Sequence, residues 1–433
     1  MPQCDSIFYF HPVTQEILIE AIDKLKNKKS EDRNGLSNFF VKTFKRELVP
    51  TVTHLVNSFI VDDKFPKSLK TVRVVPLFKS GDLKDMNNYR PLAMVSPISK
   101  VYEQIMIHQI NRYLDINKIL YTHQFGFQKK TGTEDAVRCC HETLQKSSNL
   151  YSVVIAIDLK KVFDSVSIRL LKMKLKRLGF SKTAIKSMSS YLEGRSQFVQ
   201  VSKGSKKYTS QILNILAGVG QGTAIGPLLF LIFINDIAPY LMKQAFKIVL
   251  SIFFILLFAD DVLLILSNKN LNNLEVDAYI LINLFNQWCE INLLSMNRVK
   301  TKFFFVCNRK RKPGINFNIL VDETEIDRTL VIKYLGLLID EKLNFSHHVN
   351  QLCAKLNSST FVLRLLARFC DSNLLLVYHA LVVSHINYCL SVWSNCNQKL
   401  SEKVFKIQKK LCGTFLSCVN QIRVSHILLI TAY

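Results

Sequence analysis

The sequence lacks the features of a membrane-spanning or disulfide-stabilised protein. Its longest apolar segment, Ile248–Phe258, has only 11 residues and contains Ser251, whereas a helix needs about 20 apolar residues to cross a bilayer. Extending the segment to Leu266 would bury two aspartates in the membrane, which is costly. The 11 cysteines include no Cys-x-x-Cys pair. Neither a zinc site nor a disulfide framework is therefore indicated, and we interpret the cysteines as mostly buried thiols in a reducing compartment.

Acidic residues are scarce relative to basic ones. The chain has 33 Asp and Glu against 57 Lys and Arg, which gives a formal net charge of +24 at pH 7. Solubility requires a much smaller excess, so the charge predicts a polyanionic partner. Nucleic acid is the main candidate and an anionic membrane surface the alternative. With 48% hydrophobic residues in 433 positions, the chain is globular and long enough for two or three domains.

The N-terminal region shows no secretory signal, because it contains Asp5, His11 and Glu16 and has no long apolar stretch. We therefore expect an intracellular protein, in the nucleus or cytoplasm, that is not secreted and does not span a membrane.

The tetrapeptide Phe258-Ala259-Asp260-Asp261 is the centre of the sequence pattern. It lies between the apolar segment that ends at Phe258 and a second one, Val262–Leu266. This pattern predicts a tight turn between two buried strands, with both carboxylates at its tip. Hard divalent cations such as Mg²⁺ prefer carboxylate oxygens, so a metal site is one interpretation. The other is an ordinary turn whose aspartates face water.

A third carboxylate follows another buried strand. Val153–Ile157 is continuously apolar and ends at Asp158. A carboxylate at the end of a buried strand can reach a site at the tip of that strand. Asp158 could therefore join Asp260 and Asp261 around two metal ions.

Two basic residues flank a predicted strand–turn–loop unit. Lys79 ends a strand over residues 72–79, and Arg90 lies in the loop that leads into a helix from Ser96 to about Leu114. Such a pair of cations suits a triphosphate, although two surface cations of a basic protein would look the same. Further along, the segment Gly218–Pro227 has four glycines in its first nine positions, which indicates close backbone approach. The segment lacks the ending of a phosphate-binding P-loop.

The C-terminal part, from Ser346 onward, is predicted to be helical. Its last helix places Val404, Ile407 and Leu411 on one face, and lysines on another. A basic amphipathic helix fits a nucleic-acid backbone, and a solvated face is the alternative. The final residues, Ser425–Tyr433, show no closing pattern, which favours a truncated end.

Taken in order, these segments resemble the reverse transcriptases of non-LTR retrotransposons of the jockey-like group. The resemblance runs from about Phe10 to Lys410. It is carried by residues 74–82, 88–92, 124–127 with 133–136, 158–166, 218–236 and 258–261, by Trp288, Asn292, Asn297, Lys300 and Thr301, and by 334–336. Each motif alone is weak, but eight in the family's order are specific.

The resemblance implies an α+β right-hand polymerase, with fingers and palm around an antiparallel sheet and an α-helical thumb. Residues 1–150 would form an N-terminal extension and the fingers, and residues 151–345 the palm. The reverse transcriptase domain would cover about 70–340. Residues 346–433 would form the thumb.

The resemblance also assigns roles to single residues. Asp158, Asp260 and Asp261 would bind two Mg²⁺ ions, or Mn²⁺, and would be catalytic. Lys300 would protonate the leaving group. The residues expected to contact the nucleotide are Lys79, Arg90, Phe163, Gln221 and Gly222, with Phe163 excluding a 2′-hydroxyl. Those expected to contact nucleic acid are Tyr334, Leu335, Gly336, Lys403, Lys406 and Lys410.

The expected activity is that of an RNA-directed DNA polymerase, a nucleotidyltransferase that adds dNTPs to a DNA primer on an RNA template. Two alternatives remain: a decayed copy that only binds nucleic acid, and an RNA-templated RNA polymerase, against which Phe163 argues. Departures from the family pattern favour decay, such as Val162 in place of a small alanine and Gly220 in place of proline. Nothing resembles an endonuclease or a Cys/His knuckle, so we expect that this chain alone does not nick its target.

Overall fold

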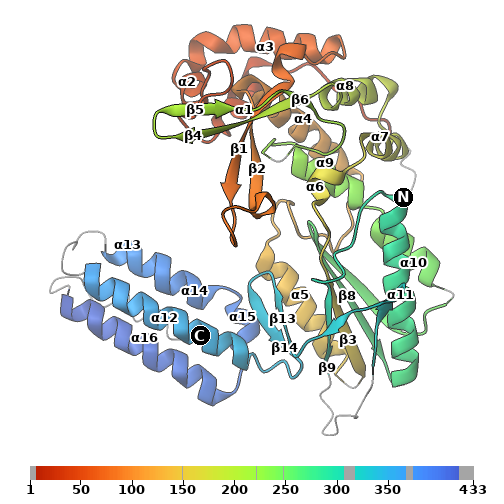
Figure 1. Ribbon diagram of the computed structural model, residues 1–433, viewed down its shortest axis with the longest axis vertical. Helices are drawn as coiled ribbons and strands as arrows, with labels where there is room; N and C mark the ends of the chain where they lie inside the picture. The colour runs from red at the N-terminus through yellow and green to blue at the C-terminus, as the bar shows by residue number, and fades with distance from the viewer. Residues whose placement is uncertain are drawn as a thin grey trace. The chain divides into compact units, whose positions relative to one another are not determined.

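The computed structural model describes residues 6–148, 150–220, 222–246, 248–306, 317–366 and 374–418 (Figure 1). The chain divides into two compact units that alternate along the sequence. The first unit comprises Met1–Phe127, Leu159–Lys247 and Asn283–Met296, and the second comprises Gln128–Asp158, Ile248–Ile282 and Asn297–Tyr433. Each unit is described by itself below.

The first unit is mainly helical. Its helices are α1 (Gln15–Asp23), α2 (Asn38–Thr43), α3 (Lys45–Val61), α4 (Pro97–Ile116), α6 (Val162–Ser165), α7 (Ile168–Arg177), α8 (Lys182–Leu192), α9 (Gly226–Ile234) and α10 (Ile237–Ala245), with the 3-10 turns η1 (Lys67–Leu69) and η2 (Met86–Asn88). The long helix α4 follows Ser96 at its N-cap and begins with Pro97, a residue that suits the first turn of a helix.

The sheet of the first unit contains β1 (Thr71–Phe78), β2 (Tyr89–Met94), β4 (Ser196–Lys203), β5 (Lys206–Thr209) and β6 (Leu213–Asn214). The strand order is β2-β1-β4-β5, and β6 also pairs with β4. Strand β1 is antiparallel to β2 and parallel to β4. This sheet is therefore mixed, whereas the resemblance predicted an antiparallel one.

Helices α9 and α10 lie in a segment, Gly226–Ala245, that is long and apolar enough to cross a membrane by length and composition. Within the described residues, 67% of its most apolar window is buried inside the structure. Every residue from Leu228 to Ile234 is buried, and a helix that is apolar on all sides is typical of a protein core. We therefore assign this segment to the core of the first unit.

The second unit is built on a five-stranded sheet in the order β12-β9-β3-β8-β7. Its strands are β3 (Tyr151–Ile157), β7 (Ile252–Phe258), β8 (Asp261–Asn268), β9 (Lys302–Val306) and β12 (Asp327–Arg328). Strand β3 is antiparallel to β8 and β9, and β12 is parallel to β9. Residues 153–155 and 262–266 are almost fully buried, which explains why both strands are continuously apolar.

One helix packs on the edge strand β7 of this sheet. Helix α5 (Thr133–Lys146) packs on β7, and α11 (Leu271–Ile291) continues from the second unit into the first. Two small hairpins follow, β10 (Leu320–Val321) with β11 (Thr324–Glu325) and β13 (Val331–Tyr334) with β14 (Leu337–Asp340). Together the two units make an α+β fold, as predicted.

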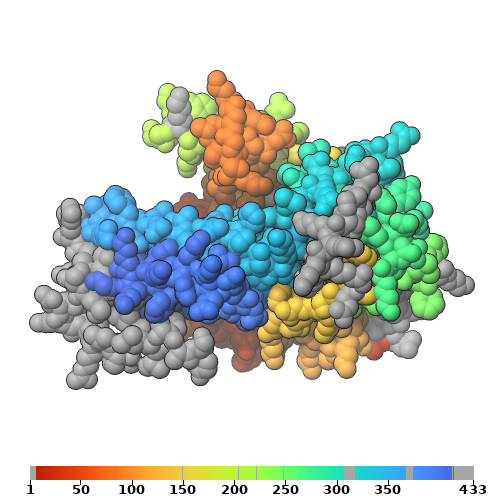
Figure 2. Space-filling model, turned by 90° about the horizontal axis from the view of Figure 1, so that it is seen from below, coloured from red at the N-terminus to blue at the C-terminus, as the bar shows by residue number. Residues whose placement is uncertain are grey.

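The C-terminal part of the second unit is helical, as the sequence predicted. It contains α12 (Ser346–Leu366), α13 (Leu374–Tyr378), the π-helical turn η3 (His379–Val383), α14 (Ser384–Asn387), α15 (Leu390–Trp393) and α16 (Gln398–Cys418). Helices α12 and α16 pack along each other and lie side by side on the surface in Figure 2, in two shades of blue.

Candidate active site

Three carboxylates lie at one end of the sheet in the second unit. Strand pairing places Ile157 of β3 opposite Val262 of β8, so the next residue of β3, Asp158, lies beside Asp261. Phe258 of β7 pairs with Asp261, which leaves Ala259-Asp260 as a two-residue turn. Ala259 has a φ of 54°, as expected inside such a turn. The predicted turn between two buried strands is therefore confirmed.

The three carboxylates affect one another electrostatically. Desolvation, followed by the negative charges of Asp260 and Asp158, raises the pKa of Asp261 from 3.8 to about 6. Both charges that act on Asp261 are of its own sign, and like charges oppose ionisation. A cation placed among these groups would reverse this effect.

The neighbouring loop holds Asp158 in place. The Asn297 Nδ2 donates to Asp158 Oδ2 at 2.9 Å, and the Asn297 backbone N–H donates to the Asp158 carbonyl at 2.7 Å. The Asp158 N–H donates to Thr301 Oγ1 at 3.4 Å, and that hydroxyl donates to the Asn297 carbonyl at 2.9 Å. Thr301 is fully buried. Sequence reasoning placed Asn297 and Thr301 in a motif but gave them no role.

The donor set suits a hard divalent cation because it consists of carboxylate oxygens. Among the described residues, however, no three Asp, Glu, His or Cys side chains converge closely enough to hold a metal ion. A cation shared by Asp158, Asp260 and Asp261 would therefore require these side chains to turn toward one another.

The hairpin of β13 and β14 carries the next predicted residues of this unit. Leu335 and Gly336 have φ values of 45° and 95°, so the hairpin closes in a two-residue turn of the type that needs left-handed backbone. The Tyr388 hydroxyl donates to the Leu335 carbonyl. A side chain at Gly336 would come within 3.3 Å of the Tyr388 ring. Glycine at this position thus permits the turn and its contact with Tyr388.

The side chain of Tyr334 is 3% exposed. Its hydroxyl has no hydrogen-bond partner among the described residues. Burial, together with the charges of Cys140 and Asp261, raises the pKa of Tyr334 well above its usual range. The predicted nucleic-acid contact at Tyr334 would therefore have to come through its backbone, since the ring is in the core.

The lysines predicted for this unit lie on the surface. Lys300 is in the turn after Asn297, and its side chain is exposed. Lys403, Lys406 and Lys410 are exposed along α16, and Lys403 Nζ donates to Asn350 Oδ1 at 3.5 Å. No hydrogen bond from Lys300 to the three aspartates occurs among the described contacts.

The first unit carries the residues predicted to contact the nucleotide. Leu77 of β1 pairs with Arg90 of β2, and the Lys79 N–H donates to the Asn88 carbonyl at 2.8 Å. Lys79 and Arg90 are therefore both exposed near the turn of one antiparallel pair. Gln221 lies outside the described residues.

The glycine-rich loop is attached to the segment that carries Phe163. The Val219 N–H donates to the Phe163 carbonyl at 2.8 Å, and the Gly218 N–H to the Val166 carbonyl at 2.9 Å. The Phe163 ring packs against Phe230, with centroids 4.7 Å apart. These contacts fix the position of Phe163 relative to the loop.

Gly222 lies where only glycine fits. Its φ is 104°, and a Cβ atom there would come within 2.8 Å of the Ala93 carbonyl oxygen. The close backbone approach predicted from four glycines is therefore confirmed at this position, and the neighbour is strand β2.

A buried glutamate, which sequence reasoning missed, holds the same loop. Glu103 of α4 is 0% exposed. It accepts hydrogen bonds from the Tyr191 hydroxyl at 2.6 Å and from the Ala224 N–H at 2.5 Å. The buried Arg195 acts on Glu103 electrostatically, and its guanidinium lies 5.0 Å from the centre of the Tyr191 ring. Burial outweighs these contacts and raises the pKa of Glu103.

The Glu103 contacts predict a large effect of truncation on stability. Glu103→Ala removes the acceptor of two buried donors and leaves a cavity, so we expect unfolding free energy to fall by about 2–4 kcal/mol. The exposed His108 on the same helix is the control, because His108→Ala should change it by less than about 0.5 kcal/mol. Denaturant unfolding measures both. Equal, small effects of the two substitutions would contradict this account.

The raised pKa of Asp261 predicts a pH-dependent stability. Asp261 ionises less readily in the folded chain than in the unfolded one. The free energy of unfolding of the wild type therefore falls as the pH rises from about 4 to about 6. Without divalent cations, Asp261→Asn should therefore unfold at a higher temperature than the wild type at pH 7.5, and the difference should vanish near pH 4. The control is Asp115→Asn, at an exposed carboxylate. A difference that is constant with pH would argue against the carboxylate cluster.

Comparison with known proteins places this chain in a family. Residues 79–339, more than half of the chain, match the model of the family described as reverse transcriptase (RNA-dependent DNA polymerase). The RNA-directed DNA polymerase from mobile element jockey of Drosophila melanogaster is 27% identical over 344 residues, which cover 78% of this chain and 36% of that protein.

Other curated relatives give the same result. The probable RNA-directed DNA polymerase from transposon BS of the same species is 28% identical over 78% of this chain and 37% of its own length. The probable RNA-directed DNA polymerase from transposon X-element of the same species is 24% identical, over 92% of this chain and 43% of its own length. The chain thus spans less than half the length of these relatives. The resemblance seen in the motifs is confirmed, and the chain belongs to the reverse transcriptase family, related to the jockey, BS and X-element enzymes of non-LTR retrotransposons.

Proposed function

We propose that this chain is an RNA-directed DNA polymerase that adds dNTPs to a primer 3′ end on an RNA template. The observation that carries the proposal is the position of Asp158, Asp260 and Asp261 at one end of the β3-β8-β7 sheet, where burial, and then the charges of the first two, raise the pKa of the third. Membership of the reverse transcriptase family supports this reading of the carboxylates.

The three aspartates would hold divalent metal, which the family generally uses. Two Mg²⁺ or Mn²⁺ ions, when bound, would lower the pKa of the primer hydroxyl and neutralise charge on the triphosphate. The hydrogen bond from Asn297 orients Asp158 by engaging only its Oδ2 oxygen, so the Oδ1 oxygen stays available to a ligand. The role of Lys300 would be to give a proton to the leaving pyrophosphate.

The nucleotide would be contacted from the first unit. Lys79 and Arg90 would bind its phosphates, and Gln221 and Gly222 would lie along its base pair with the template. Phe163, which packs against Phe230, would lie under the sugar and exclude a 2′-hydroxyl. Glu103 would act as a positioning residue, because it holds the loop through the Ala224 N–H.

The right-hand arrangement of fingers, palm and thumb is part of this proposal, with the boundaries expected from the sequence. The β13–β14 turn at Tyr334, Leu335 and Gly336 would contact the primer. Lys403, Lys406 and Lys410 on the exposed face of α16 would contact the phosphate backbone. A nuclear or cytoplasmic location remains a prediction.

Primer extension on an RNA template with Mg²⁺ and dNTPs tests the proposal. We expect incorporation by the native chain and a loss of at least a thousandfold in Asp260→Ala, while Asp115→Ala retains full activity. Removal of Mg²⁺ should abolish incorporation, and its return should restore it. Binding of template–primer without any incorporation would instead support the decayed copy that only binds nucleic acid. A preference for rNTPs over dNTPs would point to an RNA polymerase.

A further inference from the structure

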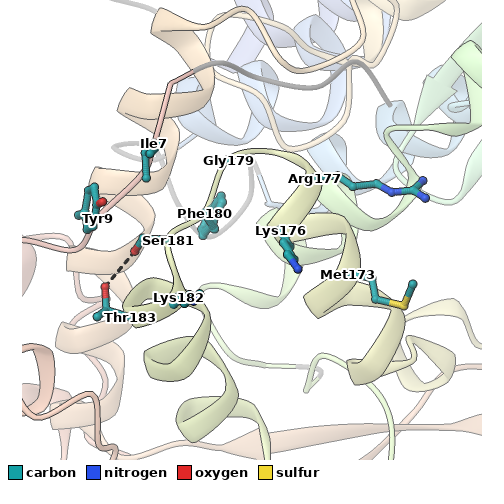
Figure 3. A pocket seen from close by; sticks show the side chains of 10 residues that line it. All are labelled: Ile7, Tyr9, Met173, Lys176, Arg177, Gly179, Phe180, Ser181, Lys182 and Thr183. Atoms are coloured by element: carbon teal, nitrogen blue, oxygen red, sulfur yellow. Dashed lines mark hydrogen bonds between the residues drawn. The ribbon is translucent and has the colours of Figure 1, made fainter.

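A surface groove in the first unit is separate from the residues described so far. We call it the N-terminal groove, and its volume is about 940 Å³. It is lined by Ile7, Tyr9, Met173, Lys176, Arg177, Gly179, Phe180, Ser181, Lys182 and Thr183 (Figure 3). Figure 3 shows Ile7 and Tyr9 on one side, helix α7 with Met173, Lys176 and Arg177 on the other, and the 179–183 segment between them.

Backbone pairing builds one wall of the groove. The Phe8 N–H donates to the Gly179 carbonyl at 2.9 Å, and the Ser181 N–H donates to the Phe8 carbonyl at 3.0 Å. Extended chain alternates its side chains, so Phe8 points inward while its neighbours point outward. Phe8 is 5% exposed, whereas Ile7 and Tyr9 are 62% and 47% exposed.

Among the lining residues, Phe180 is buried and packs against aromatic rings that do not line the groove. The Phe8 ring lies 4.5 Å from Phe180 and 5.2 Å from Tyr113, centroid to centroid. Gly179 has a φ of 88°, and a Cβ atom there would come within 2.2 Å of the Ser6 carbonyl oxygen. Glycine is therefore required for this close approach, and Ile7 and Tyr9 are held outward on a defined support.

Helix α7 supplies charge to the opposite wall. Residues 173, 176 and 177 have the i, i+3, i+4 spacing that places side chains on one helix face, and all three are exposed. Lys182 adds a further exposed cation at the start of α8. No acidic residue occurs between positions 165 and 192, so α7 and the start of α8 contribute only positive charge to this wall.

The three cations of the groove are available to a ligand. Neighbouring basic residues are engaged: Lys172 with Glu193, Lys174 with Asp236, and Lys186 with Asp63. Within the described residues, no ion pair includes Lys176, Arg177 or Lys182. Lysine and arginine side chains grouped without carboxylates attract polyanions.

The groove lies at the opposite end of α7 from the glycine-rich loop. Residue Val166, just before α7, accepts a hydrogen bond from Gly218 of that loop. Lys176 and Arg177 end the helix ten residues later, which corresponds to about 15 Å along its axis. The groove is therefore not the place where the nucleotide is proposed to bind.

We propose that the N-terminal groove binds single-stranded RNA. Lys176, Arg177 and Lys182 would contact successive phosphates, and bases would stack on the exposed ring of Tyr9 beside Ile7 and Met173. Cations combined with exposed aromatic and apolar side chains are the usual means of binding single strands. The bases of a duplex are already stacked, so a duplex could use only the cations. The proposal rests on the proposed function in one respect, since it takes RNA to be the polymer that this chain handles.

Fluorescence anisotropy with a labelled 12-nucleotide single-stranded RNA tests the proposal, in the presence of excess unlabelled template–primer duplex. The test variant carries K176A, R177A and K182A. The control carries K24A, K26A and K28A, which removes the same charge from exposed lysines of the same unit. We expect the groove variant to lose at least tenfold in affinity and the control less than twofold.

Salt dependence and base stacking give two further readouts. Loss of three phosphate contacts should reduce the slope of log affinity against log salt by about 2, and the control should keep the native slope. Tyr9→Ala should weaken RNA binding about tenfold while leaving the slope unchanged. Circular dichroism melting of each variant establishes that it is folded.

Equal losses in the groove and control variants would overturn the proposal, because they would show only non-specific attraction. So would unchanged binding in Tyr9→Ala together with equal affinity for duplex RNA of the same length. Primer extension by the native chain is measured separately, so that failure of the groove and failure of the polymerase can be told apart. If the native chain shows no incorporation but the groove variant still loses RNA binding, the proposed polymerase fails and the groove stands.

Discussion

The pairing register between β3 and β8 is the constraint on which the candidate active site depends. Ile157 opposite Val262 brings Asp158, at the end of one strand, beside Asp261, at the start of the other. A slip of one residue would turn every side chain of a strand to the opposite face of the sheet. The register is fixed because both strands are buried and apolar over most of their length.

This arrangement places three carboxylates close together at one end of the sheet, where their negative charges do not stabilise the fold. Burial, and then the negative charges of Asp260 and Asp158, raise the pKa of Asp261 to about 6, so the folded chain opposes ionisation of Asp261. Asp158 is nonetheless restrained, because it accepts a hydrogen bond from the Asn297 side chain and its N–H donates to Thr301 Oγ1. Residues that reduce stability in this way are typical of functional sites. A divalent cation would remove the repulsion, and the charge pattern is therefore better explained by a ligand than by stability of the fold.

Much of this site was predictable from the sequence because its elements are local. The run Val153–Ile157 and the turn at Ala259-Asp260 follow from continuous apolar segments with carboxylates at their ends, and the family motifs gave their order. Contacts between distant residues were not predictable. Glu103 meets Ala224 across 121 positions, and Phe8 pairs with Phe180. A single buried glutamate or an isolated bridge leaves no periodicity in the sequence. For the same reason, the alternation of the two units along the chain could not be predicted.

Metal binding tests most directly whether Asp158, Asp260 and Asp261 form a cation site. Electron paramagnetic resonance of free Mn²⁺ counts the ions bound by the purified chain without any reaction taking place. We expect up to two bound ions for the native chain, competition by Mg²⁺, and loss of binding in a variant with asparagine at all three positions. Undiminished Mn²⁺ binding by that variant would contradict the account, as would a native chain that binds no Mn²⁺ either alone or with template–primer and dNTP present.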